Sequence, residues 1–206
     1  MLAESDGAEA VRLARSAVES SLARPERRDA AAEFRTVPLP AVFDEPRGVF
    51  VTLRRHPNGD LRGCIGFPSA VFPLRAAIPR AARSAALDDP RFPPVRAVEL
   101  NSLRLEVSIL TVPEVIDATP RRELVRKVTV GRDGLIVDRS GASGLLLPQV
   151  PKEFGWDAAE FLSATCEKAG LDPEAWLSPA TTVRRFEAEV FEELSPGGAV
   201  RRETLD

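Results

Sequence analysis

The chain has 206 residues, of which 44% are hydrophobic and 29% are charged, and its net charge is −3. This length and composition suffice for the buried core of one medium-sized globular domain. The balance of charge gives no overall attraction for nucleic acid or an anionic membrane. No apolar run approaches the ~20 residues that cross a bilayer, and the N-terminus lacks the basic start and apolar stretch of a signal peptide. We therefore expect a cytoplasmic protein.

Metal-binding and disulfide-forming residues are few. The chain contains two cysteines, Cys64 and Cys166, and one histidine, His56. Two cysteines do not make the disulfide framework of a small secreted domain. Together with one histidine they cannot complete a zinc site without carboxylates. We expect neither a metal nor a cofactor.

The first half of the chain predicts two helices and a hairpin. Apolar residues recur at helical spacing over 8–23 and 70–87. Residues 48–55 and 61–65 are rich in β-formers and enclose an Asn-Gly turn signal at Asn58-Gly59. A two-residue turn there would pair Cys64 with Leu53.

The second half continues the alternation of strands and helices. A strand over 103–109 alternates apolar and polar residues. The remaining predicted elements are a short helix at 121–127, a hairpin of 134–138 with 144–147, a helix at 157–169, a last strand at 182–191 and a flexible tail at 195–206. Asp157 and Glu160 give the helix at 157–169 a capping-box start, and Gly170 gives it a glycine stop. Because hairpins dominate, we predict an α+β fold with a mostly antiparallel sheet flanked by helices.

The segment Arg62-Gly63-Cys64-Ile65-Gly66 is the strongest candidate for a functional site. In an extended strand Arg62 and Cys64 share a face, and Gly63 between them allows close approach of a backbone or ligand. A guanidinium and a nearby helix N-terminus would both stabilise a thiolate, which makes Cys64 a candidate catalytic residue. The same groups could bind an anion through Arg62 and backbone N–H groups. The alternative is a purely structural role, in which Cys64 serves packing and the glycines form an ordinary turn.

A base for Cys64 is hard to find. The predicted hairpin register separates His56 from Cys64 by three residues, or ~10 Å, which exceeds hydrogen-bond reach. Glu106 is a candidate on the polar side of its strand, although a solvated side chain explains it as well. Cys166 lies on the apolar stripe of a helix and is expected in the core.

The segment Leu61-Arg62-Gly63-Cys64-Ile65-Gly66 resembles the signature of the AMMECR family. Further segments resemble the family in the same order along 8–192: Gly48-Val49-Phe50-Val51-Thr52-Leu53, Asp89-Pro90-Arg91-Phe92-Pro93-Pro94, Glu106-Val107-Ser108-Ile109-Leu110-Thr111, Gly131 with Gly134-Leu135, Leu147-Pro148-Gln149-Val150, Trp156-Asp157, and Cys166-Glu167-Lys168-Ala169-Gly170-Leu171.

The resemblance implies an AMMECR-type domain over 8–192, built as a larger subdomain that holds both termini and a smaller inserted one. It also implies a prokaryotic setting, as protein A of the AmmeMemoRadiSam system, beside Memo-like and radical-SAM proteins. It gives no catalytic set to carry over. The positions carried over as cleft and ligand-binding residues are Arg62, Gly63, Gly66, Asp89, Arg91 and Glu106, together with Cys64.

Three functions remain open. The first is an accessory domain that binds a partner or a small anionic ligand at a cleft along Leu61-Gly66. The second is an enzyme that uses Cys64 as a nucleophile or redox thiol. Nucleic-acid binding is the weakest of the three, because the net charge is negative and aromatic residues make up only 6% of the chain. The residues alone do not decide whether the protein is an enzyme.

Overall fold

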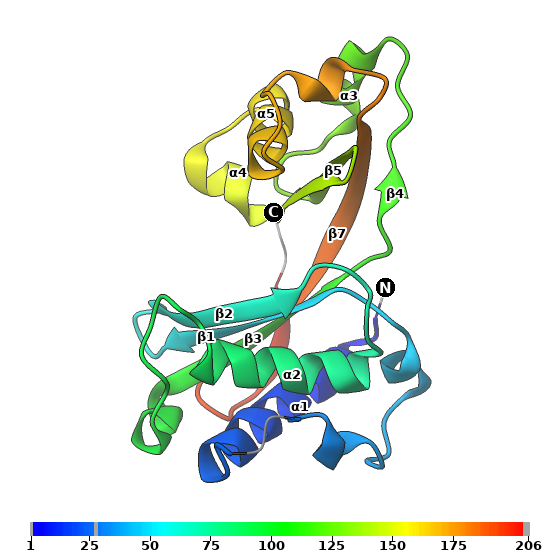
Figure 1. The fold of residues 1–206 in the computed structure, drawn as a ribbon. Helices are drawn as coiled ribbons and strands as arrows, with labels where there is room; N and C mark the ends of the chain where they lie inside the picture. Colours follow the sequence, from blue (N-terminus) through cyan, green and yellow to red (C-terminus); the bar gives the residue numbers. More distant parts are fainter. Residues whose placement is uncertain (1, 27–28, 204–206) are drawn as a thin grey trace. The chain divides into compact units, whose positions relative to one another are not determined.

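The computed structural model describes residues 2–26 and 29–203 (Figure 1). They divide into two compact units. Unit 1 consists of residues up to 110 and from 189 onward, and unit 2 consists of residues 111–188. Unit 2 is thus an insertion into unit 1, which agrees with the predicted larger and smaller subdomains. Among the described residues, no helix combines the length and apolarity that a membrane span requires.

Unit 1 is built on an antiparallel sheet. Strand β1 (Val49–Arg55) lies between β2 (Leu61–Phe67) and β3 (Leu103–Leu110), and the sheet continues through the end of β7 (Thr182–Glu193) to β8 (Val200–Glu203). Figure 1 shows helices α1 (Glu4–Ala23) and α2 (Leu74–Leu87) on the same side of this sheet. The strands of unit 1 therefore present one face to two helices.

Alternation along the strands assigns side chains to the two faces. The fully buried core contains every second residue of β1 and β3: Val49, Val51, Leu53, Leu105, Val107 and Ile109. These residues form one hydrophobic cluster with α1 and α2. The intervening residues, among them Thr52, Arg54 and Glu106, lie on the opposite face because successive side chains of a strand alternate. We call this opposite face the polar face of unit 1.

Unit 2 has its own sheet and core. Strand β5 (Asp133–Arg139) pairs with β6 (Ala142–Leu146) and with the first part of β7, which also pairs with the short β4 (Glu114–Val115). Its helices are α3 (Leu124–Lys127), α4 (Gln149–Phe154) and α5 (Ala158–Lys168). The capping box of α5 is present: Asp157 Oδ1 accepts from the Ala159 and Glu160 N–H groups, and Glu160 Oε2 accepts from the Asp157 N–H. The apolar stripe of α5 packs into the core of unit 2 through Phe161, Leu162 and Cys166.

The predicted fold class is confirmed, and the differences are local. Helix α1 begins at Glu4, earlier than predicted, and β4 and α4 carried no signal strong enough to predict them. The prediction of a structureless tail from residue 195 is wrong for residues 200–203, which form β8 on β7. The last three predicted tail residues lie outside the described part of the chain.

The predicted register of the first hairpin is also wrong. Cys64 pairs with Thr52, and Leu61 pairs with Arg54, with a β-bulge between these pairs. The Arg55 N–H donates to the Asp60 carbonyl, so four residues form the turn in place of two. The bulge adds one residue to β2, and this residue is Arg62. The longer turn and the bulge together shift the register, which an Asn-Gly signal alone could not reveal.

Candidate functional site

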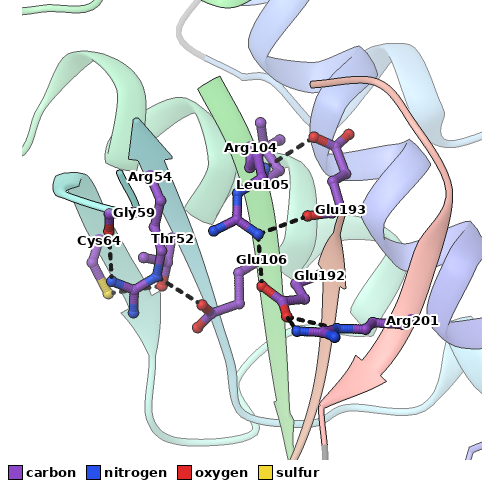
Figure 2. A network of polar contacts seen from close by, with 10 residues as sticks. All are labelled: Thr52, Arg54, Gly59, Cys64, Arg104, Leu105, Glu106, Glu192, Glu193 and Arg201. Atoms are coloured by element: carbon purple, nitrogen blue, oxygen red, sulfur yellow. Dashed lines mark hydrogen bonds and ion pairs between the residues drawn. The ribbon is translucent and has the colours of Figure 1, made fainter. Parts of the chain in front are cut away.

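Three polar side chains form a row across the polar face of unit 1. Thr52 on β1 lies opposite Cys64 on β2 and opposite Glu106 on β3. Directly opposed side chains of neighbouring strands lie close enough to interact. The Thr52 hydroxyl donates to the Cys64 sulfur at 3.4 Å (Figure 2). Thr52 and Glu106 are buried, whereas Cys64 is half-buried. The row therefore ends in a thiol that solvent reaches.

Arg54 is the cation of this row. Its Nε donates to Glu106 Oε2 at 3.0 Å, and its Nη1 approaches the Gly59 carbonyl at 3.5 Å. Figure 2 draws its guanidinium near the Cys64 sulfur. Burial alone would lower the pKa of Arg54, but Glu106, by charge and by hydrogen bonding, raises it, with smaller contributions from Glu203 and Cys64. Arg54 therefore stays cationic beside the thiol.

A second ion pair holds the backbone of Cys64. The buried Asp89 carboxylate accepts the Cys64 N–H at 2.8 Å, and Arg91 Nη2 donates to the Cys64 carbonyl at 2.9 Å. Arg91 also grips Asp89 through Nε and Nη2. These two side chains satisfy one backbone donor and one backbone acceptor of β2, which a neighbouring strand would otherwise satisfy.

The ion pair of Asp89 and Arg91, which we call the Asp89 clamp, shifts the pKa of both of its members. The pKa of Asp89 lies well below its ordinary value, first because of the hydrogen bond from Arg91 and also because of the N–H of Cys64. The pKa of Arg91 is raised, first by its hydrogen bond to Asp89 and to a smaller degree by Cys64. Arg91 is thus the second cation whose charge acts on Cys64.

Arg62 has a different place from the one predicted. It is buried in the bulge, and its Nε and Nη2 donate to the two oxygens of Glu99 at 3.0 and 3.3 Å. Its Nη1 donates to the Pro93 carbonyl at 2.9 Å. The pKa of Glu99 is lowered, first by Arg62. The Arg62 guanidinium therefore holds the loop that follows α2, and the guanidinium groups beside Cys64 are those of Arg54 and Arg91.

The two signature glycines allow close backbone approach. A Cβ on Gly63 would lie 2.1 Å from the Ala85 carbonyl oxygen of α2. A Cβ on Gly66 would lie 2.3 Å from the Val49 carbonyl oxygen and 2.5 Å from the Phe50 ring. These contacts confirm the expected close approach, but the approaching groups belong to the fold.

The structure thus brings together Cys64, Glu106, Asp89 and Arg91 from the predicted set, and it adds two residues that sequence reasoning missed. Thr52 and Arg54 lie on a predicted strand at alternate positions, so their shared face could have been inferred. Their meeting with Cys64 and Glu106 depends on the register, which the sequence did not reveal. His56 is exposed in the turn.

Beyond the row, the polar face of unit 1 carries a network of ion pairs (Figure 2). Glu192 accepts from Arg104 at 3.2 Å and from Arg201 at 2.7 Å. Burial raises the pKa of Glu203, and the neighbouring carboxylates Glu106 and Glu192 add to this effect. Within the described chain, no cluster of three or more His, Cys, Asp or Glu has an arrangement suited to a metal ion.

Comparisons with known proteins show the family of this chain. The AMMECR1 family model matches residues 11–191. A protein of Thermococcus gammatolerans is 58% identical over 164 residues, which cover 78% of this chain and 80% of that protein. A protein of Methanocaldococcus jannaschii is 46% identical over 205 residues, with 100% and 98% coverage.

A solved structure shares the whole fold. The crystal structure of the uncharacterized protein PH0010 from Pyrococcus horikoshii has a TM-score of 0.85 and 49% sequence identity, and the match covers 98% of both chains. Fold and site together define an α+β domain with a cysteine on an edge strand. The chain belongs to the AMMECR1 family.

Proposed function

We propose that this protein is an accessory domain that binds a small ligand at the row Cys64–Thr52–Glu106 and acts together with a partner protein. The observation that carries the proposal is the chemistry around the Cys64 sulfur. A hydroxyl and two guanidinium groups act on a half-exposed thiol, and the Asp89 carboxylate accepts the backbone N–H of the same residue. Such a mixture of donors and acceptors at one accessible point suits recognition.

Among the described residues, no base makes a hydrogen bond to the Cys64 sulfur, which favours binding over catalysis. The Glu106 carboxylate already accepts from Arg54, and the one histidine of the chain lies in the exposed turn. A nucleophilic thiol normally relies on an adjacent base that takes up its proton. The described neighbours of Cys64 can stabilise charge and donate hydrogen bonds, which serves a bound ligand.

Native mass spectrometry tests the binding function. The protein is incubated with a metabolite extract and desalted, and its mass is compared with that of the variants Thr52→Val and Glu106→Gln. Both variants keep side-chain volume, but the first removes a hydroxyl from the row and the second removes a negative charge. We expect the wild type to retain a small molecule that both variants lose while both remain folded by circular dichroism. Retention by none of the proteins, or equal retention by all, would refute the proposal.

The partner part of the proposal rests on family resemblance. A Memo-like protein and a radical-SAM protein are the expected partners, and each can be purified and mixed with this chain. We expect a complex with at least one of them in size-exclusion chromatography, with weaker binding for Arg91→Gln than for the matched surface variant Arg12→Gln. Independent elution of all three proteins, with and without the retained ligand, would reject these partners.

An enzyme that uses Cys64 as a nucleophile is the second candidate. It is favoured by the Thr52 hydroxyl, which donates to the sulfur, and by the two cations beside it. A covalent adduct on Cys64, found by intact-mass analysis after incubation with extract and absent from Cys64→Ser, would support it over simple binding.

A further inference from the structure

We propose that the ligand of this site carries an anionic group, a carboxylate or phosphate, which Arg54 and Arg91 bind beside the Cys64 sulfur. This inference rests on the proposed function and names the chemical class of its ligand. The sequence predicted that Arg62 would bind this anion, and the inference assigns that role to Arg54 and Arg91.

Arg91 keeps part of its hydrogen-bonding capacity free. Its Nε and Nη2 are bound to Asp89 and to the Cys64 carbonyl. Nη1 takes part in none of these bonds, and the side chain is 53% exposed. The buried Asp89 fixes the orientation of the guanidinium, so the free donors are held in place before a ligand arrives.

Arg54 offers a second set of donors from the opposite side of Cys64. Its Nε is bound to Glu106 and its Nη1 to the Gly59 carbonyl, while its Nη2 has no partner within the described part of the chain. The side chain is 38% exposed. Arg54 follows Thr52 by two residues on the same face, so it lies diagonal to Cys64, a distance that a long side chain spans. A guanidinium donates to carboxylate and phosphate oxygens through paired N–H groups.

The other arginine-rich parts of unit 1 differ from this pair. Arg104 and Arg201 both donate to the Glu192 carboxylate, and Arg15 donates to Glu193 through two nitrogens at 2.5 and 2.6 Å. Arg54 and Arg91 are likewise paired with the protein's own Glu106 and Asp89, but Nη2 of Arg54 and Nη1 of Arg91 take no part in those bonds. At Cys64, these two partly exposed guanidinium groups lie beside a thiol and a hydroxyl, so an anion from outside would bind their remaining donors.

Two alkylating reagents of similar size test this inference without knowledge of the ligand. Iodoacetate and iodoacetamide both react when the thiolate sulfur attacks the methylene carbon, the carbon–iodine bond breaks and iodide leaves. Only iodoacetate carries a carboxylate. The quantity to compare is the ratio of the iodoacetate rate to the iodoacetamide rate, for Cys64 in the folded protein and for glutathione. Peptide mass spectrometry assigns the modification to Cys64.

We expect the ratio at Cys64 to exceed that of glutathione by about tenfold, which corresponds to the lower end of the stabilisation that one charge-assisted hydrogen bond gives. The variants Arg54→Gln and Arg91→Gln should each lower the ratio, Arg91→Lys should keep part of it, and Arg12→Gln, which removes the same charge elsewhere in unit 1, should leave it unchanged. Inorganic phosphate should slow the iodoacetate reaction more than chloride at equal ionic strength.

The outcomes separate the two proposals. Reaction of Cys64 with both reagents at the glutathione ratio would overturn the anion site and leave ligand binding standing. A ratio that falls equally in Arg12→Gln would also overturn it, since general charge would then explain the preference. A Cys64 that neither reagent modifies in the folded protein would overturn both the proposed function and this inference.

Discussion

Cys64 and Cys166 place the same side chain in two contrasting environments, one in each unit. Cys64 lies on an edge strand, half-exposed, with a hydroxyl donor and two cations around it. Cys166 lies on α5, fully buried, and burial raises the pKa of its thiol. Only the first environment can serve a ligand in solution. The apolar stripe of the helix predicted the burial of Cys166, because core positions follow from helical periodicity. The environment of Cys64 depends on neighbours that come from three separate segments of the chain.

The largest expected effect is a difference in alkylation rate between the two thiols. With iodoacetamide at neutral pH, Cys64 should react about 1,000-fold faster than Cys166, because Cys166 reacts only after a local opening that costs several kcal/mol. Peptide mass spectrometry over a time course measures both rates in one sample. Comparable rates would show that the two environments are functionally alike.

The next effect concerns the glycine beside Cys64. Gly63→Ala should lower the free energy of unfolding by about 3 kcal/mol, since its Cβ would meet the Ala85 carbonyl oxygen at 2.1 Å and α2 must shift. Urea denaturation followed by circular dichroism measures this loss. The matched control is Gly141→Ala: this glycine has a φ of +87° and no atom within 4 Å of a new Cβ. We expect about 1 kcal/mol there, from backbone strain alone. Equal losses would mean that close packing against α2 is not what Gly63 provides.

A smaller effect should follow from the Asp89 clamp. Asp89→Asn should destabilise the protein by about 2 kcal/mol at pH 7, because a buried carboxylate with charge-assisted hydrogen bonds is lost. Since the folded-state pKa of Asp89 lies below its ordinary value of 3.8, its stabilisation is present above that pH and is lost as the pH falls further. The difference between wild type and variant should therefore begin to shrink below about pH 4 in thermal melts and keep shrinking as the pH falls toward the folded-state pKa. A difference that stays constant from pH 7 to pH 3 would exclude ionisation of Asp89 as its source.

Much of the fold could be predicted from the sequence, for identifiable reasons. Alternation in 103–109, helical spacing in 8–23 and the capping box at Asp157 are local patterns with direct structural meaning. The short β4 and the strand β8 were missed because two and four residues give too little periodicity. The N-terminal start of α1 was missed for lack of a side-chain cap at Ala3.

The site was predictable only in part. The signature residues lie on β2, and the resemblance pointed to Asp89, Arg91 and Glu106, which the structure places around the row. The role of Arg62 was misjudged because one inserted residue, the bulge, gave it the partner Glu99. Thr52 and Arg54 went unnoticed because their importance comes from a cross-strand register that long-range pairing determines.

Strand β7 has a consequence for how the protein is synthesised. Its residues up to 188 belong to unit 2, and its last five belong to unit 1. A ribosome therefore releases α1, α2 and the first three strands long before the strand that pairs with the outer edge of β3. Until about residue 193 has emerged, β3 has an unsatisfied edge, which is a place where nascent chains can associate wrongly. Strand β5 of the inserted unit also pairs with β7, at residues 182–187, so the sheets of both units wait for the same strand to emerge.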